Sequence, residues 1–434
     1  MIGMKKLFKN RNYMLLFMGS LVSSIGTVLF SFASGLYVQD IFNKPIYGNR
    51  GAFYFSIVVG VSIFGKVIFS PLAGALIDRL NKVKILYLTD IFRGIMFFVL
   101  IVLLRVLSND YHILILFIIV SFLSGSFQAL FNPASGSLLP EVVGDNMLQK
   151  ANGLNSIISS FKTIFGVLVG MVLYELIGIE MAILVNAISF VISGFSEMFI
   201  KVKFKEKIKK ERNIKADIKA GFVYLKNHQA LLSLLTFSLI LNFAFSPLFS
   251  IAIPYLFYTE LNLSSYYLGA INIVVALTTL VIEIYVGMKV FKSIKKTVKI
   301  SFIGMFVVFI LIASLIIIYN NNLLTFWPFY IIFLLLIIAI TSALIFTNIP
   351  INSNLVRSID SDYRGRVLSL ISAASGLTVP LSYMLAGKLI ELTGVSTTLF
   401  VYSLVLVIPV VGFLTNKRVK KFIGGFKWYF YHGI

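Results

Sequence analysis

Long apolar segments recur along almost the whole chain, and this repetition restricts the fold more than any other feature of the sequence. Twelve of these segments reach the roughly 20 apolar residues that a helix needs to cross a bilayer. Lipid offers the backbone no hydrogen-bond partners, so each segment must be helical. The sequence therefore predicts an all-α membrane protein with twelve transmembrane helices. The expected spans are residues 14–38, 52–77, 85–107, 112–133, 151–174, 181–200, 230–257, 266–288, 298–319, 326–348, 366–390 and 396–415.

The composition excludes several other classes of protein. Only 13% of the 434 residues are charged and 59% are hydrophobic, whereas a soluble domain has about 25% charged residues. The chain has no cysteine, which excludes disulfides, thiolate metal sites and iron–sulfur clusters. Its three histidines, His112, His228 and His432, lie far apart in the sequence. We therefore expect no metal ion and no cofactor.

The net charge of +21 is distributed by membrane side. With twelve spans both termini lie on one side, and nearly all of the 38 lysines and arginines fall there. This bias predicts that both termini are cytoplasmic in a multi-pass protein of the cell membrane. Contacts with anionic membrane lipids then account for the charge without a nucleic-acid partner. The exceptions are Lys44, Arg50, Arg105 and Lys388 on the other side, and Lys66, Arg93 and Lys162 inside spans.

One long polar stretch divides the spans six and six. The stretch "GALIDRLNKVKIL" follows the second span, and "GMKVFKSIKKTVKI" follows the eighth at a matching place. Halves with matching connectors indicate a duplicated transporter architecture. We predict an N-terminal six-helix half at 1–200, a cytoplasmic basic linker at 201–229, a C-terminal six-helix half at 230–415 and a cytoplasmic tail at 416–434.

The first of these connectors resembles the signature of the major facilitator superfamily. Gly74, Asp78, Arg79 and Lys82 match it, and Asn81 stands where a turn glycine is usual. Three further stretches resemble the macrolide-efflux branch of the superfamily's drug exporters. They are "FQALFNPASGSLLPEVVGDNMLQKANGLNS", "TDIFRG" and "YRGRVLSL".

The resemblance implies two pseudo-symmetric six-helix halves in the major facilitator fold. It also implies a secondary active transporter that exports amphipathic drug-like compounds by alternating access, with proton antiport as the candidate mode of coupling. Span four lacks an arginine and span five lacks a Gly-Pro pair, both of which are common in drug:proton antiporters of the wider superfamily. These departures leave the coupling ion open.

The resemblance further implies a gate on the cytoplasmic side. In the family, the acid at the Asp78 position meets the start of span eleven, where Arg364 and Arg366 lie in this chain. A helix N-terminus has unpaired N–H groups and partial positive charge, which favour an anion. Phe291 takes the place of the aspartate in the second half, so the gate is expected to be one-sided. The alternative for Arg79 and Lys82 is that they only anchor the topology. The gating candidates are Gly74, Asp78, Arg79, Lys82, Arg364 and Arg366.

Ionisable residues inside the spans are the other candidates for function. A charge at the centre of a span costs roughly 2.5–3.5 kcal/mol, so it usually faces protein or water. Asp90 and Arg93 are three residues apart, and we expect them to pair on one helical face. Asp90, Glu197 and Glu283 are the candidates for proton coupling, and the alternative for both glutamates is that they reach the interface.

Lys66, Arg93 and Lys162 are the candidates for the substrate cavity. If Arg93 pairs with Asp90, the two lysines have no obvious acid nearby. An unpaired lysine in a low dielectric either loses its proton or attracts an anion. We therefore hypothesise that Lys66 or Lys162 meets a carboxylate or phosphate on an anionic or zwitterionic substrate.

Three alternatives to drug export follow from the same sequence. One is an exporter or flippase of an anionic amphiphile, such as a siderophore or a lysolipid. Another is a membrane-embedded transferase, but the inner loops lack convergent acid and base residues, so we expect no enzyme and no catalytic residues. A third is a receptor, which would bind without flux. The expected partners are a small amphipathic substrate, protons and anionic lipids, with no obligate protein partner.

Overall fold

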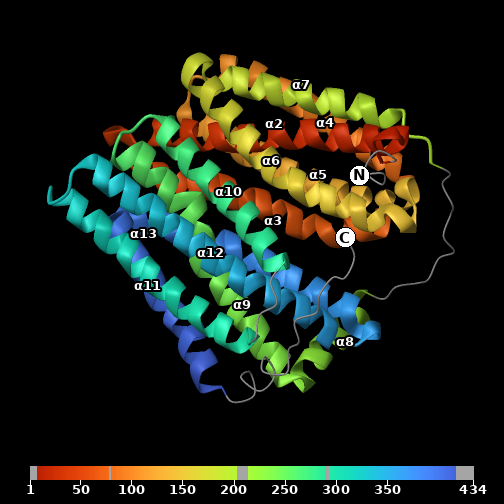
Figure 1. Ribbon diagram of the computed structural model, residues 1–434. Coiled ribbons are helices and arrows are strands. Elements are labelled where there is room, and N and C mark those ends of the chain that lie inside the picture. Colours follow the sequence, from red (N-terminus) through yellow and green to blue (C-terminus); the bar gives the residue numbers. More distant parts are fainter. Residues whose placement is uncertain (1–6, 78–79, 203–213, 289–292, 417–434) are drawn as a thin grey trace. The chain divides into compact units, whose positions relative to one another are not determined.

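The computed structural model describes residues 7–77, 80–202, 214–288 and 293–416, and this described part contains only helices and the turns that join them (Figure 1). Contacts divide the chain into two compact units. The first unit holds Met1–Lys209 together with Phe257–Ile273. The second holds Lys210–Leu256 and Val274–Ile434.

In the first unit, α2 packs against both α6 and α7, α4 packs against α7, and α3 packs against α5 (Figure 1). Asparagine side chains begin three of these helices by accepting hydrogen bonds from their first free N–H groups: Asn10 for α2, Asn81 for α4 and Asn109 for α5. The elements are α2 (Arg11–Phe42), η1 (Pro45–Tyr47), α3 (Gly51–Ile77), α4 (Lys82–Val106), α5 (Asp110–Val143), α6 (Asp145–Ile177) and α7 (Ile179–Met198).

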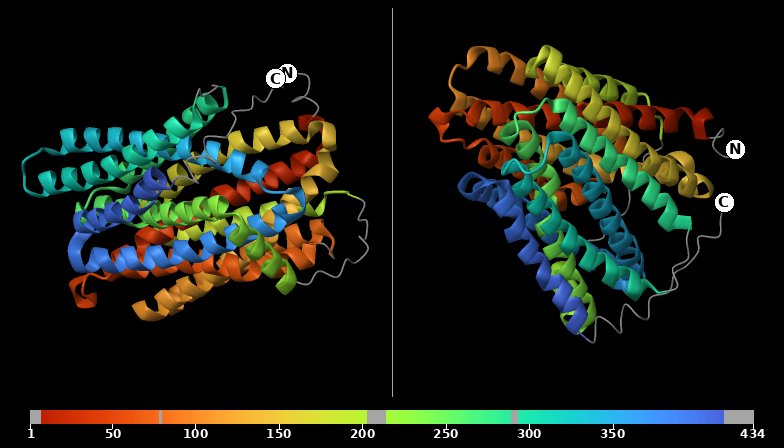
Figure 2. Two further views of the ribbon diagram at one scale, coloured as in Figure 1. Left: turned by 90° about the horizontal axis from the view of Figure 1, so that it is seen from below. Right: turned by 60° about the vertical axis from the view of Figure 1, so that its left-hand side comes forward.

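In the second unit, α13 packs against α9, α11 and α8. The backbone of α13 breaks at Gly394, where φ is 79°, so this element is two helices joined end to end (Figure 2). The remaining elements of the chain are α8 (Ile214–Asn227), α9 (Gln229–Pro247), η2 (Leu248–Ala252), η3 (Tyr255–Glu260), α10 (Ser265–Met288), α11 (Ile294–Asn320), α12 (Phe326–Ser358) and α13 (Ser361–Thr415). Most of η3 and the start of α10 belong to the first unit. Both η2 and η3 are π-helical.

The twelve predicted spans are confirmed. Ten helices of the described part are long and apolar enough to cross a membrane. A further span is α6, whose apolar part covers Phe165–Ile177, and the break at Gly394 divides one of the ten into two spans. The protein is therefore an all-α, multi-pass membrane protein.

Some helices are longer than the predicted spans. Span four was expected to end at residue 133, but α5 continues through Pro133 and Pro140 to Val143. Only Gly144, at φ 72°, separates α5 from α6. Proline inside a membrane helix is tolerated where neighbouring groups satisfy the freed backbone carbonyl groups, and so hydrophobic length alone placed this boundary too early.

The predicted linker at 201–229 contains a helix of its own. This helix, α8, packs against α13 with the side chains of Tyr224 and Leu225 buried. In α8, apolar residues pack against the protein and polar residues face water. The length of apolar runs does not reveal such an amphipathic helix.

Candidate functional site

Glycines bring three helices of the first unit into close contact. A Cβ atom at Gly94 of α4 would lie 2.6 Å from Val191 Cγ2 of α7. Reciprocally, a Cβ at Gly194 of α7 would lie 2.8 Å from Ile91 Cγ1 of α4. On α2, Gly19 and Gly26 lie against side chains of α7 in the same manner. Small residues let membrane helices approach closely, and here they enclose a group of charged side chains.

This group, Asp90, Arg93 and Glu197, is here called the charge cluster. Asp90 and Glu197 are 0% exposed and Arg93 is 5% exposed. Arg93 Nη1 donates to Asp90 Oδ1 at 3.3 Å, so the pair expected from their spacing is present. The guanidinium also lies over the rings of Phe131 and Phe190, at 5.4 Å and 5.2 Å from their centroids.

Glu197 joins this pair from α7, although no pattern in the sequence placed it there. It is close enough to interact electrostatically with both Asp90 and Arg93. Its side chain is fully buried within the protein, whereas Glu283 on α10 is exposed. The charge cluster therefore combines two carboxyl groups with one guanidinium in a buried site.

Lys162, on α6, lies on the other side of α2. Its Nζ donates to Ser24 Oγ at 3.3 Å, and no carboxylate pairs with it among the residues that the structure describes. A Cβ at Gly166, one turn further along α6, would lie 2.6 Å from Val28 Cβ of α2. This close approach keeps Lys162 beside α2. Lys66, by contrast, is exposed on α3.

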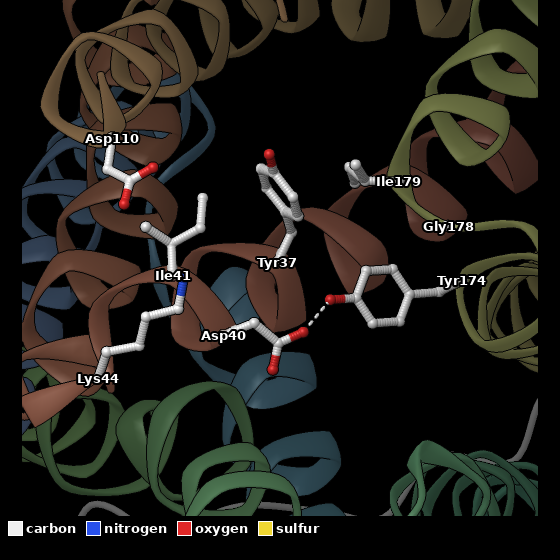
Figure 3. A pocket seen from close by; sticks show the side chains of 8 residues that line it. All are labelled: Tyr37, Asp40, Ile41, Lys44, Asp110, Tyr174, Gly178 and Ile179. Atoms are coloured by element: carbon white, nitrogen blue, oxygen red, sulfur yellow. Dashed lines mark hydrogen bonds between the residues drawn. The ribbon is translucent and has the colours of Figure 1, made fainter. Parts of the chain in front are cut away.

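The end of α2 at Phe42 carries a set of hydrogen bonds, here called the Asp40 cluster. Asp40 Oδ2 accepts from the hydroxyls of Tyr174 on α6 (Figure 3) and of Tyr258 on η3, the latter at 2.9 Å. Next to it, Thr259 Oγ1 donates to Gln39 Oε1 at 2.8 Å. The sequence did not identify these residues, because the three segments are far apart in the chain.

Glu175 extends the Asp40 cluster to the start of α10. Its Oε1 accepts from the Ser264 hydroxyl at 3.0 Å and from the Ser265 N–H at 2.7 Å. A carboxylate at this position satisfies a free N–H group and favours the helix dipole. The segment Phe257–Ile273 is thus held to α2 and α6 by polar contacts.

A pocket of about 620 Å³ opens beside Asp40 within the first unit (Figure 3). Its lining combines two carboxylates, one lysine and two tyrosine rings with apolar side chains. In η1, the Tyr47 hydroxyl donates to Asp110 Oδ2 at 2.6 Å, and this hydrogen bond raises the pKa of Tyr47. The lining residues are Tyr37, Asp40, Ile41, Lys44, Asp110, Tyr174, Gly178 and Ile179.

Among the gating candidates, the structure describes Lys82 most fully. Its Nζ pairs with Glu141 Oε1 at 2.5 Å and donates to the Ser137 carbonyl at 3.1 Å, so it ties the start of α4 to α5. Gly74 lies in α3. Asp78 and Arg79 lie outside the described residues, as do the side chains of Arg364 and Arg366.

The start of α13, where Asp78 was expected to dock, holds a contact that the sequence did not predict. The Tyr224 hydroxyl of α8 donates to Asp360 Oδ2 at 3.1 Å and accepts from the Asp360 N–H at 3.2 Å. The Tyr224 ring stacks on Tyr363 at 4.7 Å between centroids. Burial raises the pKa of Tyr224. The linker helix is therefore attached to the first turn of span eleven.

Comparison with known proteins places this arrangement in a family. The model of the Major Facilitator Superfamily matches residues 16–383. The crystal structure of a D-xylose-proton symporter is similar to the chain, with a TM-score of 0.72, 15% identity, and 95% of this chain and 98% of the other covered. The crystal structure of the nucleoside transporter NupG gives a TM-score of 0.67, 15% identity and coverage of 92% and 98%.

A bacterial homologue of the iron transporter ferroportin, in an inward-facing state, is also similar. It gives a TM-score of 0.68 at 17% identity, with 95% of this chain and 98% of the other covered. No curated protein matches the chain. At these identities the likeness to solved structures describes the fold alone.

Proposed function

The chain belongs to the major facilitator superfamily, and from this premise we propose that it exports amphipathic drug-like compounds across the cell membrane by alternating access. It is a transporter of small molecules and not an enzyme, which removes the transferase alternative. Export and the drug-like substrate class are supported by the stretches that resemble the macrolide-efflux branch, among them "TDIFRG" at 89–94.

The main structural support for alternating access is the Asp40 cluster. It joins α2 and α6 to the segment Phe257–Ile273, which connects α9 to the greater part of α10. The contacts are hydrogen bonds at helix ends, most of them between side chains and one from the Ser265 N–H. Most of them end on a carboxylate, and a hydrogen bond to a charged group contributes about 1.5–3 kcal/mol net, because water replaces it when it breaks. We propose that they form the outer gate and exchange with water in each cycle.

A gate on the opposite side is proposed from the family resemblance. In it, Asp78 meets the start of α13 beside Arg364 and Arg366, with Gly74, Arg79 and Lys82 shaping the connector. The contact of Tyr224 with Asp360 supports a role for this helix start, because it attaches the linker helix at the same place. Replacing Asp78 with Asn should abolish transport at normal membrane insertion; unchanged flux in that variant would remove Asp78 from the gate.

The proposal also covers the membrane topology and the binding partners of the protein. Both termini, the linker at 201–229 and the tail at 416–434 are cytoplasmic, and their lysines and arginines contact anionic lipid. The six-helix halves are 1–200 and 230–415. The proposed substrate-cavity side chains are Lys66, Arg93 and Lys162, although the ion pair of Arg93 with Asp90 makes Arg93 the least available of the three. A proton is the proposed coupling ion.

A second candidate is an exporter or flippase of an anionic amphiphile. It is favoured by Lys162, which is half-buried beside α2 and has a serine hydroxyl but no carboxylate among its described neighbours. A carboxylate or phosphate on the substrate would supply the missing charge. The two candidates differ in the sign of the substrate's charge.

Flux through the purified protein tests the proposal. We would reconstitute the protein in liposomes and measure uptake of fluorescent amphiphiles of either charge, after a susceptibility and accumulation screen in cells has selected them. A receptor would bind a compound without moving it. Lower accumulation in expressing cells together with saturable flux in liposomes is expected, and binding without flux would refute transport.

A further inference from the structure

We propose that Asp90, Arg93 and Glu197 form a buried site that binds a single proton, shared between the two carboxyl groups. The structure brings these residues together from α4 and α7 against α2, all within the first unit. The site is away from the Asp40 cluster, which lies at the far end of α2. The ligand of this site is a proton, and the site consists of two carboxyl groups and one guanidinium group.

The charge balance of the site requires the proton. Two carboxylates beside one guanidinium leave a net charge of −1 in a space where both acids are 0% exposed. An uncompensated charge in such surroundings is strongly disfavoured. Two carboxylates that share a site do not both ionise readily, and their protons belong to the pair. With one proton bound, the cluster is electrically neutral.

Buried carboxyl oxygens without donors are a second argument for a bound proton. Within the described residues, both carboxyl oxygens of Glu197 are buried and have no hydrogen-bond donor, whereas the hydroxyls of Ser23 and Ser193 approach the Asp90 carboxyl group. A protonated carboxyl group supplies an O–H donor that ionised carboxylates lack. Arg93 Nε and Nη2 are buried donors without acceptors. They are available to a second carboxylate when the proton leaves, so the cluster is suited to both states.

The groups that face the cluster are otherwise uncharged. On α2, Gly19 and Ser23 face the cluster. A Cβ atom at Gly19 would lie 3.2 Å from Glu197 Cγ. From α7 it is met by Ser193 and Phe190, and from α5 by Phe131. Among the described residues, the charged groups that act on this site are therefore its own three members.

The position of the site connects it to the proposed substrate cavity. Ser23 approaches the Asp90 carboxyl group, while the next residue of α2, Ser24, accepts from Lys162. Adjacent residues of α2 thus contact the charge cluster on one side of the helix and Lys162 on the other, so protonation of the cluster can affect Lys162 through α2. This coupling rests on the proposed export function, whereas the proton site itself does not.

Infrared spectroscopy of the full-length protein in liposomes at neutral pH tests the site. Replacing Glu197 with Gln should remove one carboxylic-acid C=O band and no carboxylate band, because the remaining acid ionises beside Arg93. Asp90→Asn should give the same result for the same reason. Glu283→Gln on α10 is the control: Glu283 is not part of the charge cluster, so this variant should leave the carboxylic-acid band of the cluster unchanged.

Loss of a carboxylate band alone in Glu197→Gln or Asp90→Asn would show that both acids are ionised and would overturn the proposal. If neither variant inserts normally, the parent still decides, since absence of any carboxylic-acid band at neutral pH overturns it too. Flux separates the two proposals. Glu197→Gln should retain substrate exchange but lose accumulation driven by a pH gradient, and a parent without flux would refute export while leaving the infrared result intact.

Discussion

Arg93 is the cation of the buried charge cluster. Its guanidinium is the single cation acting on two buried acids among the described residues, and it also covers two phenylalanine rings. Removing one member of a buried ion pair leaves the other charge uncompensated, which is more damaging than losing the attraction itself.

Replacing Arg93 with Gln is therefore expected to lower the free energy of unfolding by about 3–5 kcal/mol. The matched control is Arg105→Gln on the same helix, whose side chain is 69% exposed and pairs with Glu180 at the surface. Exposed pairs contribute little, so no measurable loss is expected there. Thermal unfolding in detergent compares the two, and equal stability of both variants would contradict the role given to Arg93.

Lys162 tests the charge of the substrate. If it meets an anionic group, Lys162→Gln should weaken competition by anionic amphiphiles roughly ten-fold, which corresponds to about 1.4 kcal/mol, and leave cationic competitors unchanged. Lys66→Gln is measured in parallel, because Lys66 is the other lysine proposed for the cavity, although it is exposed on α3. Transport of a confirmed substrate is measured against both classes. Cations that compete best in the parent, with a ranking unaffected by either substitution, would exclude an anion site.

At the scale of elements, several helix contacts in the first unit depend on glycine. The backbones of α3 and α5 touch at two glycines: a Cβ at Gly65 would overlap the Phe122 carbonyl oxygen, and a Cβ at Gly125 would overlap that of Ser62. Lipid tails are as apolar as leucine, so close backbone packing takes the place of the hydrophobic effect between such helices.

Gly125→Ala should therefore separate α3 from α5 and destabilise the protein by about 1–3 kcal/mol or more. Gly136→Ala is the control on the same helix, since a Cβ there has nothing within 4 Å. Alanine is the better helix former, so the control should be neutral or stabilised by up to about 1 kcal/mol. Unfolding in detergent measures both, and an unaffected Gly125→Ala protein would mean that the backbones do not approach this closely.

At the scale of the molecule, the Asp40 cluster connects segments that are distant in the chain. Tyr258 and Thr259 lie in the π-helical element η3, and π-helical turns are frequent at functional sites. The segment Phe257–Ile273 belongs by its contacts to the first unit, although α9 and most of α10 on either side of it belong to the second. Breaking these polar contacts would free the segment from α2 and α6.

Tyr258→Phe removes one hydroxyl from the cluster and keeps the ring. We expect a larger population of molecules that are open at this end, and hence faster labelling of a cysteine at position 41 in the pocket wall. The chain has no cysteine, so a single site can be introduced cleanly. Tyr266→Phe, an exposed tyrosine in the same segment, is the control. Equal labelling rates in both variants would argue against an outer gate at Tyr258.

The sequence by itself determined the helices, because the length of an apolar run is a local property that the bilayer thickness selects. It also determined the Asp90–Arg93 pair, since a spacing of three residues brings two side chains to one face of any helix. The ends of α5 and the presence of α8 were missed because proline and mixed polarity are poor guides to where a packed helix stops.

Only the tertiary structure decided which helices share a site. Glu197 joins Asp90 and Arg93 because glycines let α7 approach α2 and α4 closely. Asp40 meets Tyr258 across 218 residues of chain. Such partners depend on how the helices pack, and each helix has several faces of similar apolar character, so composition and periodicity cannot select among them.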